Sequence, residues 1–246
     1  MSVKLGSRVF EPRAFTTLLA LALVVALVSL GRWQLHRAEE KRALYALFDS
    51  GKDATRAIDA ATPRLPRYQH VDAVGSYDPE HQILIDNMSN AEGRAGYYVV
   101  TPFALRGGGR ILVNRGWVAV GASRAVKPEV AVSTQEREIR GRTDELPRAG
   151  MQLGERVPLA PPYPVVANFP THAEIAALLR ESRWAAAANL VLLDPSEPDG
   201  YVRQWQPPGF PPVRHIAYAV QWFSLAAALT VIYFVTNVRR AGRANA

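Results

Sequence analysis

The side chains best suited to chemistry in this 246-residue sequence are five histidines, because the chain has no cysteine. Without thiols it can form no disulfide, no thiolate nucleophile and no cysteine-ligated metal or iron–sulfur site. The patterns G-x-S-x-G and H-E-x-x-H, typical of serine hydrolases and zinc peptidases, do not occur in the sequence either. We therefore expect a protein that binds rather than an enzyme.

His215 differs from the other histidines because it follows a proline-rich segment and begins a long apolar run. Imidazole is a usual axial ligand of haem iron, and an ionisable side chain at the end of a membrane span is a functional candidate. Ala219, Trp222 and Ala226 follow at helical spacing and share a face with it. That face suits a porphyrin between two spans and equally suits plain helix pairing, just as His215 suits either a haem ligand or an ordinary interfacial histidine.

His70 and His81 lie on neighbouring expected strands. A zinc site built from this pair needs further ligands, and the sequence places none beside them. Ordinary strand histidines are the favoured interpretation, so no metal other than haem iron is expected.

Two apolar runs predict transmembrane helices at 15–35 and 215–237. About 20 residues of helix cross a hydrocarbon core of roughly 30 Å, and Arg32 and Trp33 suit the headgroup zone at the end of the first run. A cleaved signal peptide is the alternative for that run, but no small-x-small cleavage site follows it. A buried soluble helix is the alternative for the second run.

The charge distribution predicts the topology. The net charge is +7, and both short tails, 1–14 and 238–246, are basic while the middle of the chain is nearly neutral. Basic residues flanking spans stay in the cytoplasm, so we expect both termini there and the segment 36–214 in the periplasm. The first tail is too short for a mitochondrial import sequence, which favours a bacterial inner membrane. Because the positive charge reports topology, no nucleic-acid partner is expected.

The middle of the chain reads as β-rich. Three glycines at 107–109 separate two strong strands and predict a hairpin. An irregular loop is expected over 145–165. Six segments have the alternation or the β-branched and aromatic residues of strands: 68–77, 81–87, 97–105, 110–120, 137–143 and 190–193.

Two helices accompany these strands. The first span should continue to about Phe48, and a second helix should run from Thr171 to about Ala188, with Thr171 and Glu174 forming a capping box. The fold class expected is a membrane protein in which two transmembrane helices flank a β-rich (α+β) periplasmic domain, a partly open barrel or a sandwich.

Three blocks of the sequence, in this order, resemble the Surfeit-locus family of cytochrome c oxidase assembly proteins, the Shy type in yeast. The middle block is the most specific, and the segment 121–200 matches only loosely. The blocks are G-R-W-Q-L-H-R-A-E-E-K at 31–41, G-Y-Y-V-V-T-P-F with I-L-V-N-R-G-W-V at 96–103 and 111–118, and H-I-A-Y-A-V-Q-W-F at 215–223.

The resemblance implies an assembly factor for haem–copper oxidase that binds haem a and helps insert it into the catalytic subunit. It implies contact with that subunit, with the haem a synthesis machinery and with membrane lipid. The family histidine that is thought to ligate haem corresponds to His215. The residues themselves add further candidates: Trp222 and Tyr218 to line the site, and His36 as a second ligand at the same interface. Arg214 departs from the family pattern before this histidine, and it suits either a haem propionate or a lipid phosphate.

The residues Asn114, Arg115, Gly116 and Trp117 form the second candidate site. They suit either a loop that contacts a partner or a strand end with a close turn. Gly116 is expected to have positive φ or to let another backbone approach. A structural chaperone that grips an oxidase subunit without touching haem is the alternative function, and in it His215 would be merely interfacial.

Overall fold

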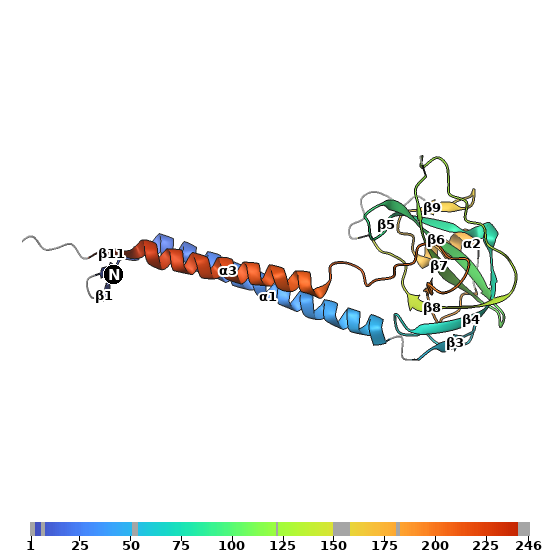
Figure 1. Ribbon diagram of the computed structural model, residues 1–246, viewed down its shortest axis with the longest axis horizontal. Helices are drawn as coiled ribbons and strands as arrows, with labels where there is room; N and C mark the ends of the chain where they lie inside the picture. Colours follow the sequence, from blue (N-terminus) through green and yellow to red (C-terminus); the bar gives the residue numbers. More distant parts are fainter. Residues whose placement is uncertain are drawn as a thin grey trace, which may run out of the picture. The chain divides into compact units, whose positions relative to one another are not determined.

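The computed structural model describes residues 3–5, 8–50, 54–121, 123–149, 158–180 and 183–240. The chain divides into two compact units. One joins the residues up to Ala46 with those from Pro208 onward, and the other spans Leu47–Pro207. Helices dominate the first unit and strands dominate the second (Figure 1).

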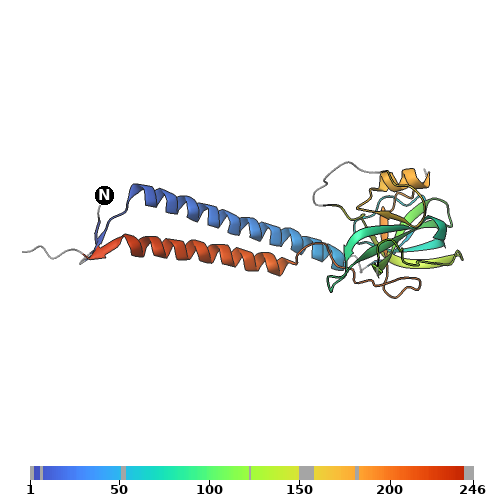
Figure 2. The same ribbon diagram turned by 90° about the horizontal axis from the view of Figure 1, so that it is seen from above.

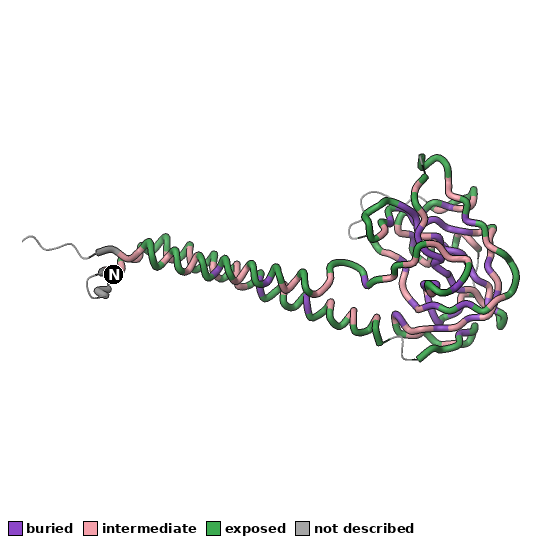
Figure 3. Tube along the Cα trace, in the orientation of Figure 1, coloured by how far each residue is buried: buried purple, intermediate pink, exposed green. Residues whose placement is uncertain are grey.

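The helical unit is built on α1 (Ala14–Ser50) and α3 (Pro212–Asn237). Figures 1 and 2 both draw the two helices side by side. Both are long and apolar enough to cross a membrane, and few of their residues are buried, the rest being exposed or half-buried (Figure 3). A core helix of a soluble protein would bury such a surface, so the exposure favours membrane anchoring. α1 runs through Phe48, as predicted.

The chain ends carry three short strands that the sequence analysis treated only as tails. β1 (Val3–Leu5), β2 (Arg8–Phe10) and β11 (Val238–Arg240) form an antiparallel sheet in the order β1-β2-β11. The ring of Phe10 packs edge-on against Tyr233, with the ring centroids 6.2 Å apart. Strands of three residues carry too little alternation to be recognised from sequence.

The other unit is a closed barrel. Its strands follow one another in the order β4-β8-β10-β7-β6, and the end of β6 pairs again with β4 to close the ring. Three further strands extend the sheet: β3 (Arg56–Ile58) beside β4, β5 (Ile83–Ser89) beside β6, and β9 (Val165–Ala167) beside β5. The barrel strands are β4 (His70–Tyr77), β6 (Ala95–Leu105), β7 (Arg110–Ala119), β8 (Arg137–Asp144) and β10 (Leu190–Leu193).

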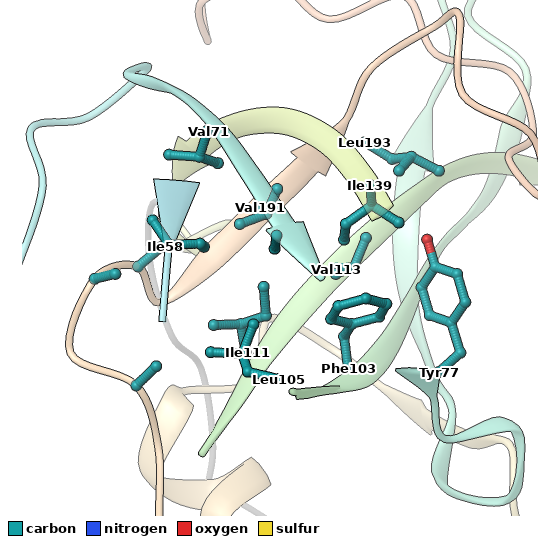
Figure 4. Close-up of a cluster of buried hydrophobic side chains, with 14 residues drawn as sticks. Ile58, Val71, Tyr77, Phe103, Leu105, Ile111, Val113, Ile139, Val191 and Leu193 are labelled. Atoms are coloured by element: carbon teal, nitrogen blue, oxygen red, sulfur yellow. The ribbon is translucent and has the colours of Figure 1, made fainter. Parts of the chain in front are cut away.

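Alternation along the strands builds the core. In β4 every second residue is buried, as a strand with one face toward a core requires. Figure 4 shows the side chains that meet inside the barrel, among them Val71 of β4, Phe103 of β6 and Ile139 of β8. A second buried cluster includes Ile85, Leu112 and Trp117.

The predicted β-rich fold between two apolar helices is confirmed, and the barrel is closed rather than partly open. All six predicted strands are present as β4, β5, β6, β7, β8 and β10. The glycine hairpin is also confirmed, because β6 and β7 are antiparallel and both Gly108 and Gly109 have positive φ. The described parts of the expected loop 145–165 are irregular until β9, and residues 150–157 lie outside the described residues.

The second helix is shorter than predicted. Its capping box of Thr171 and Glu174 is present, but α2 (His172–Leu179) ends where Arg180 takes a left-handed conformation. Residues 181 and 182 lie outside the described residues. The chain from Arg183 on is held elsewhere, because the amide of Ala185 donates to the carbonyl of Arg110 at 2.9 Å and the ring of Trp184 packs on His172. Tertiary pairing therefore overrides the helix propensity of the alanine-rich segment, and the expected helix over 171–188 is wrong in its second half.

Candidate functional site

His215 lies in the first turn of α3 and contacts α1 directly. Its Nδ1 atom lies 2.8 Å from the amide oxygen of Gln34. The imidazole is partly buried, and no hydrogen-bond partner is recorded for its Nε2 atom among the described residues. One ring nitrogen is thus used by the protein and the other is left for a second interaction.

Close packing sets this contact. Gly31 lies one turn before Gln34, and a Cβ atom built on Gly31 would lie 2.6 Å from the ring of Phe223. Ala219, one turn after His215, is only 1% exposed, and Ala226 is buried as well. The missing side chain of Gly31 leaves room for the Phe223 ring between the two helices.

The small-residue face of α3 is therefore occupied by helix pairing. The sequence left open whether Ala219 and Ala226 pack on a porphyrin or on another helix. Both are buried in a unit built on α1 and α3, which favours packing against α1. A flat macrocycle bound by His215 would have to approach from the side of the helix pair that faces away from this seam.

None of the other predicted cofactor residues makes a hydrogen bond or an ion pair with His215 among the described residues. Tyr218 is 44% exposed and Trp222 is partly buried. The guanidinium of Arg214 stacks 4.3 Å from the centroid of the Phe210 ring. The side chain of His36 is 69% exposed and contacts Glu40, with Nε2 and Oε1 3.2 Å apart. The structure thus brings Gln34, not His36, to His215, and the second-ligand role of His36 stays a prediction.

Sequence reasoning assigned no role to Gln34, to Lys41 or to Thr17. The Lys41 ammonium donates to the carbonyl of Pro208 at 2.8 Å, just before α3 begins. In the structure, the buried and half-buried residues of α1 recur at spacings of three and four, a pattern that the nearly uniform apolar sequence of the span does not reveal. Such a seam is typical of left-handed helix pairs, and it includes Gly31, Gln34, Ala38 and Lys41.

The second candidate site centres on Arg115, which is 1% exposed inside the barrel unit. Its guanidinium donates to Gln82 Oε1 at 2.9 Å and to the carbonyls of Val130, Ala131 and Asp199 at 3.0, 3.1 and 2.8 Å. Burial lowers the pKa of Arg115, yet guanidinium stays charged in proteins. A buried charge of this kind is stable only because its donors are satisfied.

Three neighbours of Arg115 complete a turn in β7. The side chain of Asn114 accepts a hydrogen bond from the amide of Gly116 at 3.0 Å. Gly116 has a φ of +117°, and a Cβ atom there would lie 2.9 Å from the carbonyl oxygen of Val202. The indole of Trp117 donates to the carbonyl of Met88 at 3.0 Å. Both expectations for Gly116, positive φ and close backbone approach, are confirmed.

All four side-chain positions from 114 to 117 are buried. They join β7 to the segment before the second span, because the amides of Trp117 and Val202 each donate to the other's carbonyl. This favours the interpretation as a strand with a close turn, and a partner contact through these residues stays a prediction.

Histidines of the barrel form no metal cluster in the part of the chain that the structure describes. His81 contacts the carboxylate of Asp78 at 2.9 Å and packs against the ring of Tyr163. Burial raises the pKa of Asp78, but hydrogen bonds from His81 and Arg110 outweigh it, so the net shift is downward. His81 lies in a short 3-10 turn, Pro79–His81, just before β5 rather than in the strand as predicted, and its ring contacts Tyr163 edge-on.

A pocket of about 380 Å³ opens at one end of the barrel. Its charged groups are already paired: Arg67 contacts Asp144 at 2.5 Å, and Arg64 contacts Glu145 at 3.4 Å. Burial raises the pKa of Asp144 in spite of Arg67. The charged side chains of this pocket therefore bind one another, and among the described residues they do not form a ligand-binding site.

The fold and these sites define a class: a membrane-anchored protein with a β-barrel between two apolar helices in the sequence and an imidazole at the start of the second helix. The chain belongs to the SURF1 family, whose model matches residues 21–227. SURF1 proteins are oxidase assembly factors rather than a catalytic family.

Similar proteins from bacteria support this membership. A SURF1-like protein of Rickettsia bellii is 30% identical over 229 residues, which cover 89% of each chain. A SURF1-like protein of Rickettsia conorii is 28% identical over 234 residues, covering 91% of this chain and 92% of the relative. A shorter match of 105 residues to a SURF1-like protein of Rickettsia felis reaches 38% identity.

Proposed function

We propose that this protein holds haem a through His215 and helps to insert it into the catalytic subunit of a haem–copper oxidase. The observation that carries the proposal is the state of the His215 ring, whose Nδ1 is engaged by Gln34 while Nε2 has no recorded partner among the described residues. A ring held in this way suits metal ligation, because a ligating histidine commonly gives its other nitrogen to a protein acceptor.

The surroundings of His215 fit a haem held at the edge of the helix pair. The exposed Tyr218 offers a ring for packing, and the exposed Arg214 offers a cation for a propionate. The buried faces of Ala219 and Ala226 are taken by α1, so the macrocycle would lie outside that seam. Haem is cargo here, and the chain's task is to present one axial ligand and release it.

The proposed location is a bacterial inner membrane, with the barrel in the periplasm and both termini in the cytoplasm. Basic residues beyond each span support this orientation. The His215 end of the helix pair would then lie at the outer interface, where it can meet the oxidase catalytic subunit, the haem a synthesis machinery and lipid headgroups.

The test is the visible absorption of the full-length protein, purified in detergent from a host that makes haem a. We expect a Soret band in the wild type, its loss in His215→Ala, and unchanged membrane insertion in that variant. His36→Ala tests the predicted second ligand, because it should change the spectrum only if two imidazoles hold the haem. Tyr233→Phe is the matched control, because it removes an interhelical contact at the opposite end of the helix pair. Full haem occupancy in His215→Ala would exclude this ligand.

A structural chaperone without haem is the second candidate. It is favoured by one observation, namely that the small-residue face of α3 is used for helix pairing. This function predicts a wild-type protein that carries no haem yet co-purifies with the oxidase subunit, with His215→Ala leaving that association unchanged.

A further inference from the structure

We infer that Gln34 is a positioning residue for His215: its amide oxygen keeps the proton on Nδ1 and leaves the lone pair of Nε2 as the donor to iron. The inference rests on the proposed function for the iron step, but the tautomer that it assigns belongs to the protein without haem. The contact that carries it is the 2.8 Å distance between Nδ1 and the amide oxygen.

The chemistry of the two groups determines the direction of this hydrogen bond. An amide oxygen has lone pairs and no proton, so it can only accept. The Nδ1 atom must therefore carry the proton, and in a neutral imidazole the other nitrogen is then unprotonated. Only the unprotonated nitrogen can donate an electron pair to a metal, so Gln34 selects which nitrogen is available.

The helix seam fixes where the amide lies. Gly31 and Phe223 pack in direct contact one turn from Gln34, and Ala219 is buried one turn from His215. Lys41 holds the carbonyl of Pro208 on the other side, which limits movement of the chain before α3. These contacts fix the two helices on both sides of Gln34 and His215. The amide and the imidazole therefore meet at a defined position along the helix pair, and the hydrogen bond holds the plane of the ring as well as its tautomer.

A plain interhelical hydrogen bond is the competing explanation, since Thr17 and Tyr233 make one at the opposite end of the same helix pair. Removing either contact would weaken helix pairing. Only the loss of Gln34 would change the protonation pattern of His215. Tyr233→Phe is therefore a matched control that removes an interhelical hydrogen bond and leaves the imidazole alone.

The experiment is ¹⁵N NMR of histidine-labelled, haem-free, full-length protein in lipid nanodiscs. With five histidines in the chain, the His215 signals are identified by their loss in His215→Ala. We expect the Nδ1–H tautomer in the wild type and in Tyr233→Phe, and a shift toward Nε2–H in Gln34→Leu. A wild type with the proton on Nε2, or a Gln34→Leu variant with an unchanged tautomer, would overturn the assignment.

Haem-loaded protein then tests the iron step. In Gln34→Leu, transfer of haem to added apomyoglobin should show an affinity about 10-fold or more weaker than in the wild type. Gln34→Glu should keep the haem and lower its midpoint potential, because a carboxylate acceptor makes the imidazole a stronger donor. An unchanged affinity and potential in both variants would refute the positioning role.

The two hypotheses fail in different ways. A wild type that shows the Nδ1–H tautomer but never takes up haem would reject the proposed function and the iron step with it, while keeping Gln34 as the residue that sets the tautomer. A wild type that binds haem through His215 equally well with and without Gln34 would keep the proposed function and reject the inference.

Discussion

The hydroxyl of Thr17 lies 2.7 Å from the phenol oxygen of Tyr233, at the end of the helix pair opposite to Gln34 and His215. Polar contacts thus stand at both ends of the helix pair, since the end with Gln34 and His215 also has the hydrogen bond from Lys41 to the carbonyl of Pro208. Polar pairs at such positions specify the register of a helix pair more than they add to its stability. The register matters here because it decides which α1 side chain reaches His215.

Tyr233→Phe should loosen the end of the helix pair that carries Thr17 by about 0.6–1 kcal/mol, because one interhelical hydrogen bond is lost in an apolar setting. The native chain lacks cysteine, so spin labels at Leu18→Cys and Val235→Cys report the distance between the helix ends specifically. We expect a broader distance distribution in the variant. Thr17→Val combined with Tyr233→Phe should add nothing to the single change, and an additive effect would show that the two hydroxyls do not interact.

Gly31→Leu should separate the helices in the middle of the seam. A Cβ atom at this position already lies 2.6 Å from the Phe223 ring, so a larger side chain forces one of the two to move. Overpacking of this kind costs roughly 1–3 kcal/mol. The same spin labels should report a longer mean distance, and Phe223→Ala should restore it by making space. A double variant as perturbed as Gly31→Leu would place the conflict elsewhere.

The strands of the barrel could be predicted because their alternation is a local property of the sequence. The position of His215 could also be predicted, since an apolar run locates the start of α3. Gln34 could not be assigned a role in this way. Its contact depends on how Gly31 and Phe223 set the approach of two helices far apart in sequence, and no local pattern contains that geometry.

Contacts between residues far apart in the sequence also explain the other differences between the predicted and the observed structure. The end of α2 is set by the bridge between Arg110 and Trp184, which lie on different elements. Arg115 could not be recognised as a core residue, because arginine is almost never fully buried unless all of its donors find acceptors. Those acceptors include Gln82 and the carbonyl of Asp199, which are brought together only by the closed barrel.

Tyr77→Phe should make the protein less sensitive to alkaline pH. Burial raises the pKa of Tyr77 from 10.0 to about 12, against the opposing effect of Arg115 and Arg137. The folded protein therefore keeps this proton while the unfolded chain loses it, and stability falls as pH rises from about 10 to about 12. The variant lacks this loss. Thermal unfolding between pH 9 and 12 measures it, and an identical pH profile in both proteins would contradict the assignment.

The same change should cost little near neutral pH. The Tyr77 hydroxyl is buried and has no hydrogen-bond partner among the described residues. Removing an unsatisfied polar group is nearly neutral or stabilising, by up to about 1 kcal/mol. The ring that stacks with Phe103 and faces Arg115 is retained. A clear drop in the unfolding midpoint at pH 7 would reveal a hydrogen bond that these contacts do not include.

Gly116→Ala should destabilise the barrel unit by about 2 kcal/mol or more. The substitution combines a positive φ with a Cβ atom 2.9 Å from the carbonyl oxygen of Val202, which belongs to backbone and cannot swing away. Gly93→Ala is the matched control, because Gly93 also has positive φ but faces open space. Its cost should be about 1 kcal/mol. Equal midpoint shifts for the two variants in thermal unfolding would show that backbone crowding at Gly116 is unimportant.

Arg115→Lys should be more damaging than its conservative appearance suggests. Lysine keeps the charge but cannot reach Gln82 and the carbonyls of Val130, Ala131 and Asp199 together, so buried acceptors lose their donors. We expect a loss of about 3 kcal/mol or more, seen as a lower unfolding midpoint and faster proteolysis of the full-length protein. Arg106→Gln, which breaks an exposed ion pair with Glu136, should leave the midpoint nearly unchanged. The contradicting outcome is an Arg115→Lys protein that unfolds at the same midpoint as Arg106→Gln while the oxidase yield falls. Arg115 would then act through a partner rather than through the barrel. The partner-contact interpretation of residues 114–117 would replace the structural one.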